Sequence, residues 1–225
     1  MARGSQSVAY QGRLYYAKVK GMKEGEQVHF HLSAKKPDGT IEDIGQEKKL
    51  TGMLVSAKHR QDTYQGQVYD KISIILSDSG AGDGGESYYI NVNAATGIGR
   101  NIINSLLSTD KYVAPITISL YNTKDGGYPN VGMYYGGDRM NWKYSMEDQA
   151  KYVSVTKEKV KDASGKVVTK DKKNYLELNE FLLNEFKGKV IPAVSAGRPQ
   201  RTETMESSEG TQPAAMMDEK LPWED

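Results

Sequence analysis

The sequence predicts a mainly β protein, and two observations support this class. Apolar residues recur at every second position in a series of short runs, as they do in half-buried strands. Turn signals rich in Gly, Asp and Pro separate these runs from one another. Helical spacing is confined to two stretches, residues 98–108 and 174–187. The chain is therefore expected to fold as a set of β-strands with two helices.

The first two expected strands, residues 8–20 and 27–35, flank a turn at residues 21–25. Residues of the second strand alternate onto one apolar face: Val28, Phe30, Leu32 and Ala34. Pro37-Asp38-Gly39 marks a turn, because Pro fixes φ and Gly accepts a positive φ. We interpret this region as an N-terminal addition to the main fold.

The order of elements after residue 50 predicts a particular barrel. Strands are expected at residues 50–58, 66–77, 88–93, 113–122 and 128–135. The helix at 98–108 lies between the third and fourth of them, with Thr96 as its candidate N-cap. Three strands, a helix and two strands follow one another in the OB-fold, a five-stranded Greek-key barrel. We predict this fold with extra N-terminal strands; a β-sandwich with one crossing helix is the alternative.

The C-terminal part of the chain predicts a hairpin, a helix and a tail. Lysine-rich runs at residues 157–161 and 166–173 flank a turn at 163–165. Residues 174–187 form an amphipathic helix with Gly188 as its C-cap. Residues 195–217 are poor in aliphatic side chains, which is typical of disorder. We therefore expect a nucleic-acid-binding domain at 1–194, which includes the C-terminal helix, and a disordered acidic tail at 195–225.

Charge and aromatic composition indicate a body that binds a polyanion. Residues 202–225 carry seven acids and one base, net −6, so the chain's total of +1 leaves +7 on residues 1–201. There are 15 Tyr and only 3 Phe, although a core built for burial alone favours Phe over Tyr, whose hydroxyl needs a partner. Many Tyr rings are therefore expected at a surface, and the positive body attracts negatively charged ligands.

The sequence offers little that would support catalysis. It holds no phosphate-binding GxxxxGK[ST] loop, and Gly80, Gly82 and Gly85 only approach a dinucleotide motif without a helix after them. His29 and His31 lack a third metal ligand at a suitable spacing, and the absence of Cys excludes disulfides and thiolate sites. We therefore expect the protein to have no enzymatic activity and to bind neither a metal nor a cofactor. With neither an apolar span nor a signal peptide, a cytoplasmic protein without membrane contact is expected.

Basic and aromatic residues interleave at residues 13–20, 58–71 and 134–144. Proteins hold single strands by stacking bases on aromatic rings while Lys and Arg contact phosphates. In an OB-fold the ligand crosses strands 2 and 3 between two loops, which correspond here to residues 58–66 and 122–128. The candidate nucleic-acid-binding residues are Arg13, Tyr15, Lys58, Arg60, Tyr64, Tyr69, Lys71, Tyr89, Tyr121, Tyr128, Arg139, Trp142 and Lys143.

The chain ends in DEKLPWED, where a Trp in a polar tail indicates a partner that buries it. With this tail, the chain resembles the bacteriophage single-stranded DNA-binding proteins, which join an OB-fold body to an acidic tail. Bacterial single-stranded DNA-binding proteins end similarly in acids, an aliphatic residue, Pro and Phe. Here Trp replaces the Phe, Lys220 interrupts the acids, and two acids follow the Trp. The resemblance implies partner binding through Asp218, Glu219, Leu221, Pro222 and Trp223.

These observations together predict sequence-independent binding of single-stranded DNA. The resemblance implies a role in phage DNA replication, recombination or repair in the host cytoplasm, with the tail recruiting other replication or recombination proteins. Two alternatives stay open at this point: a structural or adaptor protein whose β body binds another protein, and an RNA-binding OB protein. The sequence sets no oligomeric state.

Overall fold

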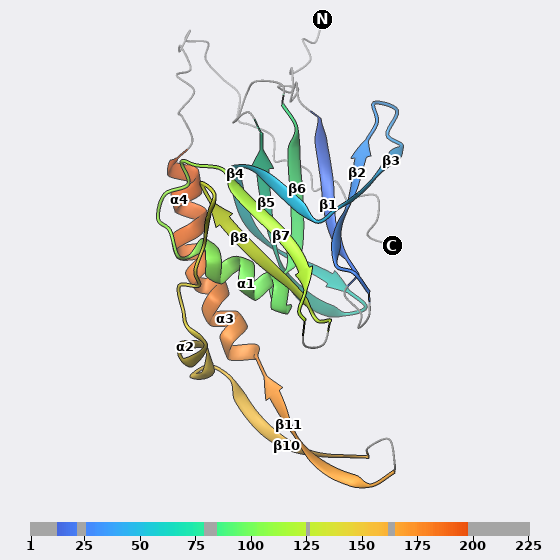
Figure 1. Cartoon of the computed structure of the whole chain (residues 1–225), viewed down its shortest axis with the longest axis vertical. Coiled ribbons are helices and arrows are strands. Elements are labelled where there is room, and N and C mark those ends of the chain that lie inside the picture. The colour runs from blue at the N-terminus through green and yellow to red at the C-terminus, as the bar shows by residue number, and fades with distance from the viewer. Residues whose placement is uncertain (1–12, 22–25, 79–84, 125–126, 162–164, 198–225) are drawn as a thin grey trace, which may run out of the picture.

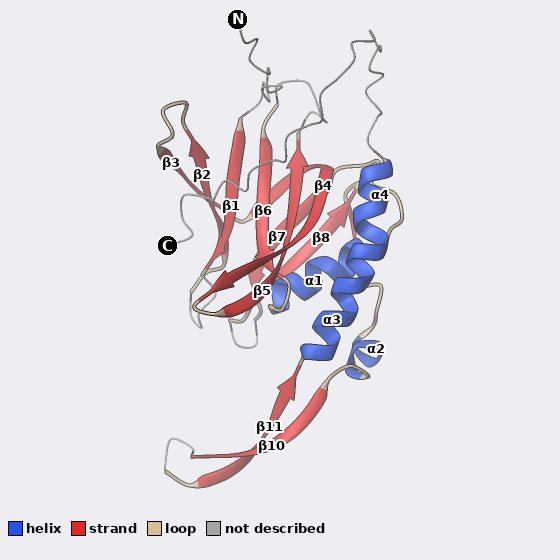
Figure 2. Cartoon of the chain, turned by 180° about the vertical axis from the view of Figure 1, so that it is seen from behind, coloured by secondary structure: helices blue, strands red, loops and turns tan. Residues whose placement is uncertain are grey.

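A computed structural model of the chain describes residues 13–21, 26–78, 85–124, 127–161 and 165–197. Its main feature is a large mixed sheet with helices along one side (Figures 1 and 2), which confirms the mainly β class. Within the described residues the strand order in this sheet is β3-β2-β1-β6-β5-β4-β7-β8-β9. The predicted acidic tail, including its five partner-binding residues, lies outside the described residues, as does the first part of the strand predicted at 8–20.

The sheet is antiparallel throughout except where β1 lies parallel to β6. Its strands are β1 (Leu14–Lys20), β2 (His29–Lys35), β3 (Ile41–Glu47), β4 (Lys49–Tyr64), β5 (Gln67–Ser77), β6 (Ser87–Asn93), β7 (Ile116–Asn122), β8 (Pro129–Tyr135) and β9 (Asp138–Arg139). The helices are α1 (Gly97–Leu106), α2 (Met146–Ala150), α3 (Leu176–Glu185) and α4 (Ile191–Ala196), and a π-helical turn, η1 (Phe186–Val190), joins the last two. A separate hairpin consists of β10 (Ser154–Lys161) and β11 (Val167–Asn174).

The sheet curls around one apolar core. Alternate residues of its strands are buried, as predicted for Phe30, Ile72 and Ile118, and α1 adds Ile98 and Ile102 to the same cluster. The helices cover this core, with α1 packed against β8 and α4 against β4. The chain before β2 meets the end of β7, because Asn122 accepts a hydrogen bond from the Val28 amide at 2.9 Å and donates one to the Glu26 carbonyl at 2.7 Å.

The N-terminus of α1 follows the prediction from sequence. Thr96 is the N-cap, and its hydroxyl accepts a hydrogen bond from the Gly99 amide at 3.1 Å. Gly99 itself lies against the backbone of the preceding strand. A Cβ atom at this position would lie 2.2 Å from the carbonyl oxygen of Asn93. Only glycine therefore lets the helix start this close to β6.

Replacement of Gly99 by Ala is expected to lower the free energy of unfolding by about 1–3 kcal/mol, the usual cost of overpacking. Urea or thermal unfolding measures this change. Gly97→Ala is the matched control in the same helix, because a Cβ at Gly97 meets nothing within 4 Å. The control should leave stability unchanged or raise it by up to about 1 kcal/mol through helix propensity. Equal losses in the two variants would contradict the close contact at Gly99.

Strand β4 is much longer than the sequence indicated. A strand was expected at residues 50–58 and a ligand-binding loop at 58–66, but β4 continues to Tyr64 and only Gln65 and Gly66 form the turn. The loop prediction is therefore wrong. Polar residues fill both faces of this half of β4, so the apolar alternation that marks a strand is lost, while the backbone stays paired with β5 up to Tyr64↔Gln67. A register shift between Leu54 and Ser56 separates this half from the rest of β4.

The C-cap predicted at Gly188 is also wrong. The helix predicted at 174–187 begins at Leu176, runs through η1 and continues to Ala196. Phe186, Val190 and Val194 recur four residues apart and are all buried, so packing maintains the helix past the glycine. Sequence reasoning also missed β3, an edge strand of mostly exposed polar residues, as well as the short elements β9 and α2.

Candidate nucleic-acid interface

The side of the sheet that faces away from the core carries a continuous polar surface. Side chains alternate between the two sides of a strand, so residues between the buried ones point to this side. One row crosses six strands in register: Lys58, Ser73, Asn91, Lys18, His31 and Gln46. We call this surface the outer face and define it by Tyr16, Lys18, His31, Lys58, Arg60, Tyr69, Lys71, Ser73, Tyr89 and Asn91.

The outer face carries an excess of positive charge. Lys18 and Lys58 make no ion pair with any described residue. Burial lowers the pKa of Lys18, and the positive charges of Lys20 and Lys71 lower it further, so Lys20 and Lys71 each lie close enough to Lys18 to repel it. An anion between them would relieve this repulsion.

One carboxylate compensates part of the charge at the β4–β5 end of the outer face. Asp62 pairs with Arg60 at 3.2 Å and also with Lys71. On the β2 side, His31 lies 3.5 Å from Asp43 of β3. The two acids stand at opposite ends of the outer face, and the row between Lys58 and Lys18 contains only neutral polar side chains.

Aromatic rings of the outer face lie between its cations. Tyr16 and Tyr89, on the neighbouring strands β1 and β6, meet edge to face with ring centroids 5.9 Å apart. The Tyr89 hydroxyl donates to Ser73 Oγ at 3.0 Å, which fixes the orientation of the ring. Tyr69 is half-buried and donates to Gln67 at 2.7 Å. Half-buried rings of this kind have an apolar body held by the sheet and a surface left for stacking.

Asn91 occupies the middle of the outer face, in register with Ser73 on one side and Lys18 on the other. Its side-chain oxygen Oδ1 is buried but accepts no hydrogen bond from the described residues. Buried polar atoms without a partner are rare in native proteins. A ligand that brings a hydrogen-bond donor, such as the amino group of a base, would satisfy this oxygen.

Two predicted residues at the start of β1 lie away from the outer face. Tyr15 is buried, donates to Glu86 at 2.8 Å and stacks on Tyr88 with centroids 5.6 Å apart. This burial corrects the expectation that Tyr15 contacts a ligand. Arg13 pairs with Glu42 at 2.7 Å, and its guanidinium lies 5.3 Å from the centroid of the Tyr15 ring.

The remaining predicted residues lie on two other surfaces. Tyr121 projects from β7 and Tyr128 from the loop before β8, both well exposed, while Arg139 on β9 is in register with Tyr134 of β8. Trp142 and Lys143 follow β9 on the α1 side, where the Lys143 amide donates to the Asn104 carbonyl at 3.0 Å. Of the thirteen candidates, the structure brings together Lys58, Arg60, Tyr69, Lys71 and Tyr89, with Tyr64 exposed at the end of the same strand face.

Tyr16, Lys18, His31 and Asn91 belong to the outer face but were missing from the predicted set. Strand alternation carried the necessary signal. Ala17 is small and apolar and takes the core side, so Tyr16 and Lys18 on either side of it must point outward.

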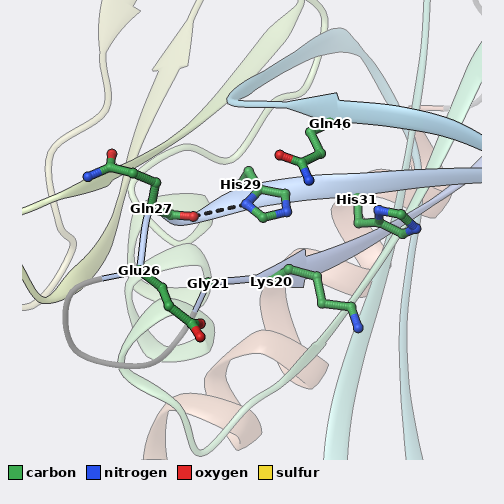
Figure 3. Close-up of a pocket in the computed structure, with 7 residues that line it drawn as sticks. All are labelled: Lys20, Gly21, Glu26, Gln27, His29, His31 and Gln46. Carbon is green, nitrogen blue, oxygen red and sulfur yellow. Dashed lines mark hydrogen bonds between the residues drawn. The ribbon is translucent and has the colours of Figure 1, made fainter.

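A pocket of about 580 Å³ extends the outer face at the β1–β2 turn (Figure 3). Its lining residues are Lys20, Gly21, Glu26, Gln27, His29, His31 and Gln46. The side chains of Lys20 and His31 border the same space in the close-up, and the His29 ring nitrogen Nδ1 donates to the Gln27 carbonyl at 2.9 Å. The pocket is therefore a polar continuation of the surface, with both signs of charge on its rim.

Within the described part of the chain, no group of three or more His, Cys, Asp or Glu side chains is arranged to hold a metal ion. The described helices include none that combines the length and the apolar character needed to cross a membrane. Comparisons with protein-family models, with curated proteins and with solved structures give no match to this chain.

Proposed function

We propose that this protein binds single-stranded DNA without sequence preference, and that the bound DNA lies across the outer face. The observation that carries the proposal is the in-register row from Lys58 to Lys18, with the Tyr16–Tyr89 ring pair beside it. Cations and aromatic rings lie close together on this surface of the sheet. They can neutralise the phosphates of single-stranded DNA and stack on its bases, the two contacts that hold such DNA on a protein.

The strand topology supports an OB-fold as the basis of this function. β4, β5 and β6 follow one another as an antiparallel meander, α1 comes next, and β7 and β8 return beside β4. In an OB-fold the nucleic acid crosses strands 2 and 3, which correspond to β5 and β6. Most of the outer face lies on these two strands and their neighbours β4 and β1, so topology and surface chemistry agree on its position.

The proposed mode of binding assigns a separate task to each side-chain type. Lys18, Lys58 and Lys71 contact phosphates as point charges, and binding releases the counterions that the phosphates had condensed. Tyr16 and Tyr89 stack on bases, which every base permits because each has a π-face. Neither phosphate contacts nor stacking distinguish one base from another, so sequence preference should be small.

The tail retains its proposed role in recruiting partners. Residues 202–225 carry a net −6 and end in the apolar Leu221-Pro222-Trp223 segment among acids. Such a segment suits an apolar pocket with a basic rim on a replication, recombination or repair protein. We place this activity in the cytoplasm of a phage-infected host cell.

Binding of a fluorescent poly-dT oligonucleotide, with duplex DNA and RNA of equal length as competitors, tests the proposed function. We expect the protein to bind single-stranded DNA more tightly than duplex DNA. In a plot of log affinity against log salt concentration, the slope should be about −0.7 for each phosphate contacted. Salt-independent binding, or equal affinity for duplex, would contradict the proposal. Stronger competition by RNA would favour the RNA-binding alternative, and absence of any nucleic-acid binding would favour the adaptor alternative.

A further inference from the structure

Strands β10 and β11 form an arm that extends from the body of the molecule (Figures 1 and 2). We call these two strands, residues 154–161 and 167–174, the arm. Eight consecutive residue pairs join its strands, from Ser154↔Asn174 to Lys161↔Val167. Neither strand pairs with any other described strand. The arm therefore receives its stability from one hairpin and from its attachment between α2 and α3.

Packing does not explain the presence of this arm. A two-stranded hairpin alone is at best marginally stable in water. Val160 and Val168 face each other and are only half-buried, while Val155 and Val167 are more than half exposed. No described side chain of β10 or β11 reaches the apolar core. A projection that contributes nothing to the core indicates a contact with something outside the chain.

The arm is strongly basic, with six Lys and two acids in its two strands. Strand alternation divides the lysines between its two faces. Lys157, Lys159 and Lys161 lie on one face of β10, about 6.7 Å apart along the strand. Lys159 and Lys161 make no ion pair with any described residue. We call Lys157, Lys159 and Lys161 the lysine row.

The opposite face of the arm is partly neutralised. Glu158 of β10 pairs with Lys172 of β11 at 3.3 Å and lies in register with Lys170. On the face of the lysine row, Lys173 adds a fourth cation, and Asp171 lies in register with Lys157. The two faces of the paired strands therefore differ in net charge, with four lysines and one acid on the face of the lysine row and two lysines and one acid on the opposite face.

We propose that the lysine row is a second nucleic-acid contact, which binds phosphates of the strand where it leaves the outer face. This inference rests on the proposed function. The arm has no aromatic side chain, so its contact with the strand is purely electrostatic. A second protein copy is a poor occupant, because protein interfaces are enriched in aromatic residues and depleted in Lys. The row instead offers point charges at regular intervals to a repeating polyanion.

Two double variants with the same change in charge test the arm. Lys159→Gln with Lys161→Gln removes two cations of the lysine row, and Lys170→Gln with Lys172→Gln removes two from the opposite face. Affinity is measured across a salt series for poly-dT of about 8 nucleotides, within the site size of one OB domain, and for poly-dT of about 30 nucleotides. On the long strand, the first variant should lower the salt slope by about 1.4, since each lost phosphate contact removes about 0.7.

The control variant should lower the salt slope for the long oligonucleotide by less than half that amount. Neither variant should change the affinity or the salt slope for the short oligonucleotide. Equal losses from both variants, or an equal loss on the short strand, would overturn the lysine row as a distinct contact. A change of oligomeric state in gel filtration with an unaltered salt slope would assign the arm to self-association. If both variants bind like the wild type, the arm is not a nucleic-acid contact, but the proposed function stands. If the wild-type protein binds neither oligonucleotide, the proposed function itself is wrong.

Discussion

Simultaneous replacement of Lys18, Lys58 and Lys71 by Gln is expected to lower the salt slope for single-stranded DNA by about 2. Each lost phosphate contact removes about 0.7 from the slope, and the three lysines lie on adjoining rows of the outer face. The loss of affinity should be largest at low salt, where screening is weakest. Fluorescence titrations of poly-dT at four or more salt concentrations measure both quantities.

A matched control removes three lysines from the helix side of the molecule. Lys111, Lys151 and Lys189 lie in the segments that follow α1 and α2 and in η1, and their replacement by Gln gives the same change in net charge. Lys151 pairs with Asp148 and Lys189 with Glu185, so the replacement also breaks two ion pairs at the helix side. This variant should retain most of the wild-type slope, because none of its lysines belongs to the outer face. If the two triple variants behave alike, the outer face is not the binding surface.

Replacement of Tyr16 or Tyr89 by Ala is expected to cost about 1–3 kcal/mol of binding free energy and to leave the salt slope nearly unchanged. Stacking on a base involves no counterion, so the two kinds of variant separate the aromatic from the electrostatic contribution. The rings contact each other at 5.9 Å, so the double variant should lose less than the sum of the single losses. Titrations of poly-dT measure these losses.

Two further variants control for this result. Tyr89→Phe keeps the ring and loses only the hydrogen bond to Ser73 Oγ, so binding should stay close to that of the wild type. Trp142→Ala removes another partly exposed aromatic side chain, but on the α1 side, and should not alter DNA affinity. A loss from Trp142→Ala as large as that from Tyr89→Ala would argue against the outer face. Thermal melts distinguish lost stacking from lost folding.

The mainly β class, the helix after the third central strand and the Thr96 cap were predictable because each depends on local pattern. Apolar residues at every second position of β5 and β7 define one buried side, and helical spacing at Ile98 and Ile102 defines another. These signals come from burial, because buried positions are occupied by apolar residues and so recur with the period of the strand or helix. The edge strand β3 has no buried side and left no such mark.

The candidate site was only partly predictable, because a site depends on which strands become neighbours. The pairing of β1 with β6 brings Tyr16 to Tyr89, and nothing local to either strand indicates this contact. Tyr15 was selected in place of Tyr16 because two adjacent tyrosines look alike in composition, although only one of them shares the core side with Ala17. In the second half of β4, charged residues resembled a loop because the strand is held by backbone pairing.

The parallel pairing of β1 with β6 also has a consequence for synthesis of the chain. Tyr16 leaves the ribosome about 73 residues before its neighbour Tyr89, a delay of roughly 4–15 s at typical translation rates. During that interval β2 can pair with one edge of β1, while the other edge exposes unpaired backbone N–H and C=O groups. Open edges of this kind are sites of mispairing between chains. The growing polypeptide therefore passes through a period in which this edge can mispair with other chains, and the period ends only when β6 has emerged.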